Sequence, residues 1–231
     1  MQSKRAPIVT LTNVCRFYTQ AAETVRAVDD VSLTIYTGEF AALCGPSGSG
    51  KTTILNMIGA LDNPTSGAVV VDGKDLGKLS ASEKSLFRRD RIGFVFQAYN
   101  LIPVLTAFEN AEFVLVLQNV DSETRRERIM SLMEQMGMKG LDNRRPDQMS
   151  GGQQQRVAIV RAMATEPAIV LADEPTANVD SQTAVSILDM MAELNQKHGM
   201  TFLFSTHDQR VIDRAHRVIR LHDGKIAENH S

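Results

Sequence analysis

Eight consecutive residues, 45–52, form a glycine-rich loop that ends in lysine and threonine, with the sequence Gly-Pro-Ser-Gly-Ser-Gly-Lys-Thr. The loop follows a short apolar run at residues 40–44, which is typical of a buried strand, and precedes a helical pattern at residues 52–61. Strand, loop and helix in this order satisfy the pattern G-x-x-x-x-G-K-[ST] in the context that it requires. The feature indicates an α/β fold that wraps a polyphosphate, and it argues against a chance glycine-rich turn.

The residue types of this loop suit phosphate binding. Glycines let the backbone approach the phosphates closely, and the amide groups at the start of the following helix provide a positive cradle. Lys51 is placed to reach the terminal phosphates. The hydroxyl of Thr52 is a suitable oxygen ligand for Mg²⁺.

A second apolar strand, predicted at residues 168–172, is followed by Asp173 and Glu174. Ligands bind beyond the carboxyl ends of strands in open α/β sheets, so both acids are expected near the phosphate loop. Asp173 would hold the Mg²⁺ shell and Glu174 would polarise the attacking water. Taken without the glycine loop, the two acids are as compatible with a solvated turn.

Residues 150–153, Ser-Gly-Gly-Gln, precede a helix predicted at residues 153–165. Two glycines at a helix start expose a second positive helix end. A protein with one phosphate loop has no obvious ligand for it. The alternative interpretation is that Ser150 caps the helix, and both interpretations can hold together.

The rest of the chain alternates between strands and helices, which predicts a parallel sheet covered on both faces. Further strands are expected at residues 31–35, 69–71, 92–96, 201–205 and 218–221, and a helix at 182–196. Residues 98–165 show helices and no convincing strand. The sequence therefore predicts one domain over residues 1–231, with a core at 1–97 and 166–231 and an inserted helical subdomain at 98–165.

Composition excludes several classes of protein. Lys and Arg number 25 against 27 Asp and Glu, a formal net charge of −2, so no nucleic-acid partner is expected. No apolar stretch reaches the ~18 residues of a membrane span, and none follows the N-terminus as a secretion signal would. Cys15 and Cys44 are too few for a disulfide framework and are expected to be reduced thiols.

Several short motifs of the chain resemble those of one family of ATPases. Residues 149–153, Met-Ser-Gly-Gly-Gln, resemble the LSGGQ signature of ABC ATPases with Met in place of Leu. Other positions resemble further family motifs in the correct order: the adenine-stacking aromatic at Tyr18, the Q-loop glutamine at Gln97, the D-loop at residues 178–180 and the switch histidine at His207. The resemblance covers essentially the whole chain. The departures, Met149, Ala177 and Val179, leave only the fine geometry of the D-loop in doubt.

The resemblance implies a P-loop NTPase core with an N-terminal antiparallel β subdomain, and ATP and Mg²⁺ as cofactors. It implies catalytic roles for Lys51, Glu174 and His207, and Thr52, Gln97 and Asp173 as metal ligands. The implied nucleotide-binding set is Tyr18, Gly45, Pro46, Ser47, Gly48, Ser49, Gly50, Lys51, Thr52, Thr53, Gln97, Ser150, Gly151, Gly152, Gln153 and Asp180.

The resemblance also implies partners. The signature of one subunit caps the ATP held by the other, so a head-to-tail pair of ATPase subunits is expected. Residues 59–67 and 93–103 resemble the bacterial macrolide-export and lipoprotein-release subfamily, which implies a separate membrane permease and a location on the cytoplasmic face of the inner membrane. The alternatives are a soluble ABC ATPase of the iron–sulfur assembly type, a nucleic-acid ABC machine, and an ordinary P-loop kinase or GTPase.

An apolar run after Gln97, from Tyr99 to Leu105, provides a candidate docking surface. Leu101 and Ile102 are expected to receive a short amphipathic helix of the permease. The alternative is that these residues belong to the core.

Overall fold

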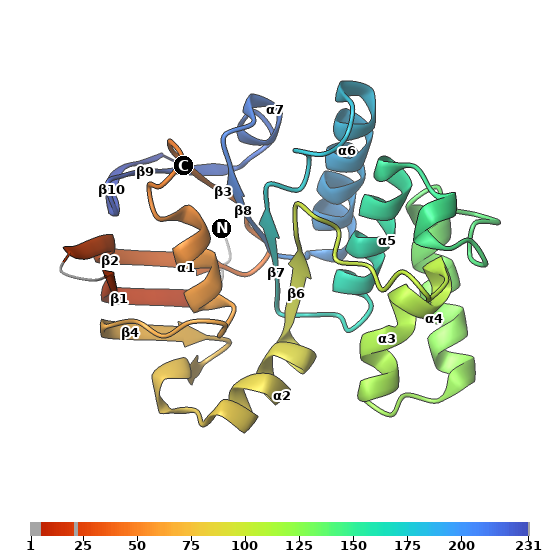
Figure 1. Ribbon diagram of the computed structural model, residues 1–231, viewed down its shortest axis with the longest axis horizontal. Helices are drawn as coiled ribbons and strands as arrows, with labels where there is room; N and C mark the ends of the chain where they lie inside the picture. Colours follow the sequence, from red (N-terminus) through yellow and green to blue (C-terminus); the bar gives the residue numbers. More distant parts are fainter. Residues whose placement is uncertain (1–5, 21–22, 231) are drawn as a thin grey trace, which may run out of the picture.

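The computed structural model describes residues 6–20 and 23–230 and contains two sheets (Figure 1). The smaller sheet is antiparallel, with the order β2-β1-β4-β5. Its strands are β1 (Pro7–Gln20), β2 (Glu23–Tyr36), β4 (Ser66–Val71) and β5 (Lys74–Asp75). This sheet is the antiparallel β subdomain that the resemblance implies.

The larger sheet has six strands in the order β10-β9-β3-β8-β7-β6. They are β3 (Phe40–Cys44), β6 (Ile92–Val95), β7 (Ile169–Asp173), β8 (Phe202–Thr206), β9 (Arg217–His222) and β10 (Lys225–His230). Strands β6, β7, β8, β3 and β9 run parallel, and β10 turns back antiparallel to β9 at the edge. The predicted parallel sheet is therefore present, extended by one antiparallel strand that the sequence did not indicate.

Helices lie at the predicted residues 52–61, 153–165 and 182–196, with small shifts at their ends, and the segment 98–165 is helical without strands. The helices are α1 (Lys51–Ile58), α2 (Ala81–Arg91), α3 (Ala107–Leu117), α4 (Ser122–Gln135), α5 (Gly151–Met163), α6 (Ser181–His198) and α7 (Gln209–Ile212), with 3₁₀ turns η1 (Leu76–Lys78) and η2 (Pro146–Gln148). Of these, α7 and the two 3₁₀ turns were not predicted. Ser80 and Thr106 form capping boxes with Glu83 and Glu109, as their spacing predicts.

The two faces of the central sheet carry two separate hydrophobic cores. Successive side chains of a strand point to opposite faces. On β3, Ala41 and Leu43 pack with α1 and the antiparallel sheet, whereas Phe40 and Ala42 pack with α3, α4, α5 and α6. In Figure 1 the antiparallel sheet lies to the left of the central strands, and these four helices lie to the right.

This arrangement places loops from β3, β6, β7 and β8 at one edge of the sheet. Parallel strands end at the same edge, so the segments that follow them meet there. Within the described residues, no helix combines the length and the apolar character needed to cross a membrane.

Candidate active site

The loop between β3 and α1 is shaped by glycines in conformations that other residues rarely adopt. Gly45 has a φ of 155°, and a Cβ there would lie 2.2 Å from the carbonyl oxygen of Leu221 on β9. Gly50, the N-cap of α1, has a φ of 100° and no side chain to cap the helix. Pro46, Ser47 and Gly48 are exposed, so the outer part of the loop is accessible to a ligand.

Lys51 is buried, and its ammonium group donates hydrogen bonds to the carbonyl oxygens of Gly45 and Pro46 at 2.8 and 2.9 Å. These partners are neutral, and a buried charge is costly unless an opposite charge balances it. The nearby Ser49 hydroxyl is also buried and has no hydrogen-bond partner among the described residues. A buried cation and an unpaired hydroxyl around an open helix start fit a phosphate group.

Thr52, at the start of α1, donates its hydroxyl proton to the Asp173 carboxylate at the end of β7, at 3.2 and 3.1 Å from the two oxygens. A hydroxyl and a carboxylate are the hard oxygen ligands that Mg²⁺ prefers. Gln97 follows β6, which pairs with β7, and its side chain is exposed. The fold therefore brings all three predicted metal ligands to one edge of the sheet.

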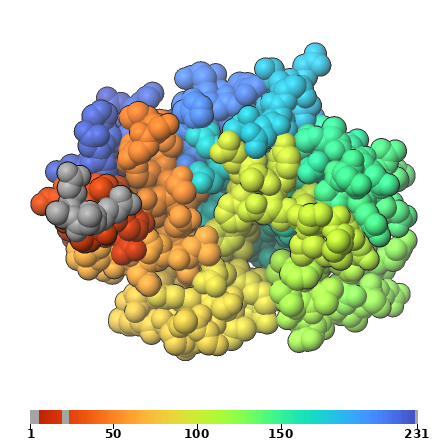
Figure 2. Space-filling view, viewed as in Figure 1, coloured from red at the N-terminus to blue at the C-terminus, as the bar shows by residue number. Residues whose placement is uncertain are grey.

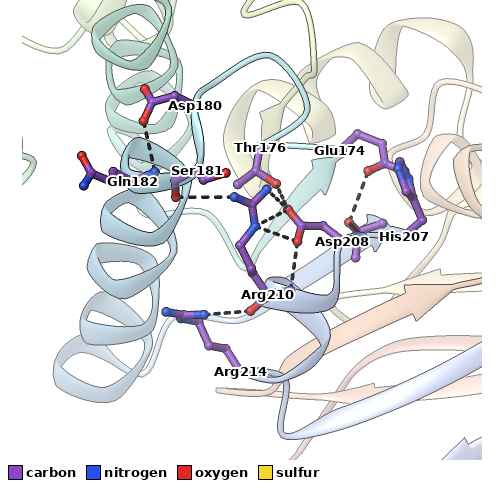
Figure 3. Close-up of polar contacts among 10 residues, drawn as sticks. Glu174, Thr176, Asp180, Ser181, Gln182, His207, Asp208, Arg210 and Arg214 are labelled. Carbon is purple, nitrogen blue, oxygen red and sulfur yellow. Dashed lines mark hydrogen bonds and ion pairs between the residues drawn. The ribbon is translucent and has the colours of Figure 1, made fainter.

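Glu174 and His207 meet between neighbouring strands, as Figure 3 shows. Nδ1 of His207 lies 2.7 Å from one carboxylate oxygen of Glu174. The other oxygen accepts a hydrogen bond from the Thr206 hydroxyl at 3.2 Å. The His207 side chain is 75% exposed and that of Glu174 is 18% exposed. The pair thus combines a shielded carboxylate with an imidazole that is open to a ligand.

Asp208 lies beside this pair and was not predicted as a site residue. Its carboxylate accepts hydrogen bonds from the Thr176 hydroxyl, the Arg210 amide and the Arg210 guanidinium (Figure 3). The bond from the Arg210 side chain is the main cause that lowers the pKa of Asp208 to about 2. The sequence carried one signal, an acid directly after His207, but no motif assigned it a role.

Tyr18 is half-buried near the end of β1. Its hydroxyl donates a hydrogen bond to Asp62 at 2.7 Å, and the Arg16 guanidinium carbon lies 4.4 Å from the ring centroid. The same Asp62 pairs with Arg16 at 2.8 Å. These contacts fix the ring orientation. The role of Tyr18 in stacking on adenine stays a prediction.

Ser150 caps α5, as one interpretation of the sequence predicted. Its hydroxyl accepts from the Gln153 amide, and the Gln153 side chain accepts from the Ser150 amide. The helix begins at Gly151, two residues earlier than expected, so both glycines lie in its first turn. A Cβ on Gly151 would lie 2.7 Å from the Tyr99 hydroxyl, and one on Gly152 would lie 2.2 Å from Cγ2 of Thr183.

The Q-loop and the D-loop segments contact each other through Asn178. The Tyr99 hydroxyl donates to the Asn178 carbonyl oxygen at 2.8 Å, and the Asn178 side chain donates to the Gln97 carbonyl oxygen at 2.9 Å. Asp180 caps α6 by accepting from the amides of Gln182 and Thr183. Its predicted part in nucleotide binding stays a prediction, because its side chain serves the helix in this structure.

Comparison with known proteins gives a consistent picture. The family model described as ABC transporter matches residues 28–177, more than half of the chain. The ABC transporter ATP-binding protein MJ0796 of Methanocaldococcus jannaschii is 44% identical over 223 residues, which cover 95% of each chain. The macrolide export ATP-binding/permease protein MacB of Hyphomonas neptunium is 43% identical over 95% of this chain, which spans about a third (34%) of that relative.

Solved structures agree with these matches. A dimeric structure of MJ0796, a bacterial ABC transporter cassette, superimposes with a TM-score of 0.90 at 43% identity, covering 96% of this chain and 98% of that chain. A dimeric post-hydrolysis state of the same cassette bound to ADP and Pi gives a TM-score of 0.89 over the same shares. The α/β fold class predicted from the sequence is confirmed by this likeness.

Proposed function

Because this chain belongs to the ABC transporter family and is an ATP-binding cassette with ATPase activity, we propose that it works as a head-to-tail pair that powers a membrane permease. The resemblance stated from the motifs is thereby confirmed, including the likeness to macrolide-export ATPases. A soluble ATPase of the iron–sulfur assembly type is not favoured. The observation that carries the proposal is that one chain holds a phosphate loop and a signature helix on different sides of the sheet (Figure 1).

The phosphate loop and the acids near it supply the binding groups for MgATP in this proposal. Lys51 holds the terminal phosphates once it exchanges its bonds to the loop carbonyls for phosphate oxygens. Thr52, Asp173 and Gln97 would hold Mg²⁺, which supplies charge neutralisation at the phosphates. Tyr18 would stack on the base.

Hydrolysis is assigned to Glu174 and His207. The Glu174 carboxylate accepts hydrogen bonds from Thr206 and faces His207, so it is fixed and oriented to polarise a water molecule. His207 is exposed enough to contact the terminal phosphate of a bound nucleotide while its Nδ1 stays on Glu174. Lys51 then stabilises the charge that develops on the phosphoryl oxygens.

The signature helix completes the site of the second subunit. Ser150, Gly151, Gly152 and Gln153 form the first turn of α5 and its cap, and a helix start attracts anions. MJ0796, whose cassette has this fold, has been solved as a dimer. ATP would favour the closed pair because its phosphates are contacted from both sides only there.

A groove between α2 and α3 is the proposed docking surface for the permease. It has a volume of about 380 Å³ and is visible as a hollow between the yellow and yellow-green helices of Figure 2. Its apolar lining residues include Leu61, Phe94, Phe96, Phe113 and Leu117. Exposed apolar side chains that form a contiguous surface mark an interaction site.

This groove refines the surface expected from the sequence. Leu101 and Ile102 are only half-buried rather than exposed, and Leu101 packs against the core of the helical segment. The exposed apolar residues of the docking groove are instead Leu61, Phe113 and Leu117, at 49%, 40% and 51% exposure. We propose that residues 98–165 act as the helical subdomain, and that the chain lies on the cytoplasmic face of the inner membrane with no nucleic-acid partner.

A matched pair of substitutions tests the groove. Leu117→Glu places a charge in it, and Val185→Glu places one on α6 at another exposed apolar position, outside the groove. In mild detergent extracts of its own cells, the tagged chain with Leu117→Glu should lose the membrane permease that co-purifies with the wild type, while basal ATPase activity persists. The Val185→Glu chain should keep the permease. Equal retention by both variants would rule out this groove.

A further inference from the structure

The backbone of Glu174 adopts a conformation that needs support from its surroundings. Its φ is 46°, in the left-handed region that residues with a Cβ rarely occupy. Such conformations persist only where neighbouring contacts over-determine them, and they gather at functional sites. The two residues that follow, Pro175 and Thr176, are buried and supply those contacts.

The first contact comes from the signature helix. Gln155 of α5 is fully buried, and its amide nitrogen donates to the Pro175 carbonyl oxygen at 2.7 Å. This hydrogen bond fixes the backbone directly after Glu174 to helix α5.

The second contact comes from the loop that carries His207. Thr176 donates its hydroxyl proton to Asp208 at 2.8 Å, and Asp208 is the residue directly after His207. The Asp208 amide in turn donates to the Thr206 hydroxyl at 2.9 Å, and that hydroxyl donates to Glu174. The loops that carry the two catalytic residues are therefore joined on both sides of the Glu174–His207 pair.

Arg210 fixes Asp208 itself. Its guanidinium donates two bonds from Nε, at 2.9 and 3.1 Å, and one from Nη2, at 2.7 Å, and its amide donates a fourth. Nη1 reaches the carbonyl oxygen of Ser181 at the start of α6 at 3.4 Å. Figure 3 shows this network running from Thr176 through Asp208 and Arg210 to Ser181. The Asp208 side chain is 14% exposed, so solvent screens these bonds little.

We propose that Asp208 is a positioning residue for ATP hydrolysis. Through Thr176 and Thr206 it fixes the positions of Glu174 and His207 relative to each other, and through Arg210 it connects them to Ser181, the first residue of α6 after the D-loop. The bonds that the Asp208 carboxylate accepts come from Thr176 and Arg210, so its proposed action on hydrolysis is indirect, through the segment that follows Glu174. The depressed pKa of Asp208 agrees with this role, because the carboxylate is ionised at neutral pH. The inference rests on the ATPase activity of the cassette.

The test compares substitutions that remove one bond at a time. Asp208→Ala removes the carboxylate and its bonds to Thr176 and Arg210, but keeps the backbone amide that donates to Thr206. Thr176→Val removes only the hydroxyl that reaches Asp208. Both should lower kcat between about 10-fold and 100-fold, because a small displacement of a catalytic group has effects of that size. The MgATP dissociation constant of either variant, measured by calorimetry, should stay within about 2-fold of the wild type, because neither residue touches the phosphate loop.

Three further variants make the test specific. Thr176→Ser keeps the hydroxyl and should restore most of the kcat that Thr176→Val loses. The double variant Asp208→Ala/Thr176→Val should be no slower than the slower single variant, since both break the same connection. Asp189→Ala is the control. Asp189 is 59% exposed and pairs with Arg214, which reaches only the backbone carbonyl oxygen of Arg210, so this substitution leaves the bonds among Thr176, Asp208 and the Arg210 side chain in place.

The outcomes separate this role from others. An unchanged kcat in Asp208→Ala and Thr176→Val would overturn the proposal. The proposal would also be overturned if the kcat losses of the two single variants multiplied in the double variant. A loss of MgATP affinity as large as the loss of kcat would overturn it too, because a purely structural role predicts that result. Should Asp208→Ala fail to fold, Asp208→Asn and the Thr176 pair carry the same test. Absence of hydrolysis in the wild-type chain would refute the ATPase function itself, a separate result.

Discussion

The phosphate loop and the signature segment are both glycine-rich turns that precede a helix, but the two helices differ in how their N-termini are capped. Helix α1 begins after Gly50, and no side chain caps it. Helix α5 begins after Ser150, which forms a capping box with Gln153. The first helix therefore leaves its N-terminal amides for a ligand, whereas the second is held in shape by its own chain before any ligand arrives.

Their surroundings differ in the same sense. Lys51, Asp173 and Glu174 gather around the phosphate loop, so it lies beside a buried cation and two carboxylates, to which we assign metal binding and general-base catalysis. The signature helix lies on the other side of β6 and β7, where Tyr99 and Asn178 pack against its first turn. This difference supports the proposal that the phosphate loop binds and hydrolyses ATP, whereas the signature helix presents a preformed surface to the second subunit.

Lys51→Ala should have the largest effect of the substitutions that separate the two segments, because the phosphate loop loses its buried cation and with it MgATP binding. We expect MgATP binding by calorimetry to weaken at least about 100-fold, since a charge-assisted contact to phosphate is among the stronger hydrogen bonds. Lys197→Ala, which removes an exposed lysine of α6, is the control. If the Lys51→Ala chain kept the wild-type MgATP affinity, the assignment of this loop to the nucleotide-binding site would be wrong.

Glu174→Gln should separate binding from hydrolysis. The amide keeps the shape of the carboxylate but cannot act as a base, so kcat should fall by about 100-fold to 10,000-fold. MgATP affinity should persist, and light scattering should show a dimer that accumulates with ATP. The exposed Glu193→Gln should behave as the wild type. Turnover at the wild-type rate would assign the base to another residue.

Tyr99→Phe should have the smallest effect, because it removes one hydroxyl from the contact between the Q-loop segment and the D-loop. A single hydrogen bond contributes about 1 kcal/mol, so kcat should fall about 2-fold to 10-fold. The ATP-dependent dimer of Glu174→Gln should weaken by a similar factor when Tyr99→Phe is added, as sedimentation can measure. Tyr36→Phe on exposed β2 is the matched control. If kcat and dimerisation did not change, the hydrogen bond between Tyr99 and Asn178 would contribute to neither hydrolysis nor dimerisation.

Local patterns predicted much of the fold. Strand β3, helix α1 and the capping boxes at Ser80 and Thr106 depend on neighbouring residues, which the sequence displays directly. Strand β1 was not identified because its alternation is interrupted. Asn13 has a φ of 47°, and the pairing with β2 shifts register around it, so apolar residues leave the period of two.

In the candidate site, too, residues in local motifs were predicted, whereas residues whose role depends on distant contacts were missed. Motifs named Lys51, Asp173, Glu174 and His207, and the structure brings them to one edge of the sheet. Asp208 and Gln155 were missed because their roles depend on contacts with residues 20 to 32 positions away. Leu101 was expected to be exposed because its neighbours are apolar, and only the packed structure shows that it belongs partly to the core.

Crosslinking between separately tagged chains can show whether the phosphate loop of one subunit faces the signature helix of the other. One chain carries Ser47→Cys in the phosphate loop and the other carries Ser150→Cys, both with Glu174→Gln and with Cys15 and Cys44 replaced. A short bifunctional thiol reagent should join the two tags only when ATP is present. Failure to join them with ATP, while a single chain bearing both cysteines crosslinks internally, would contradict the account.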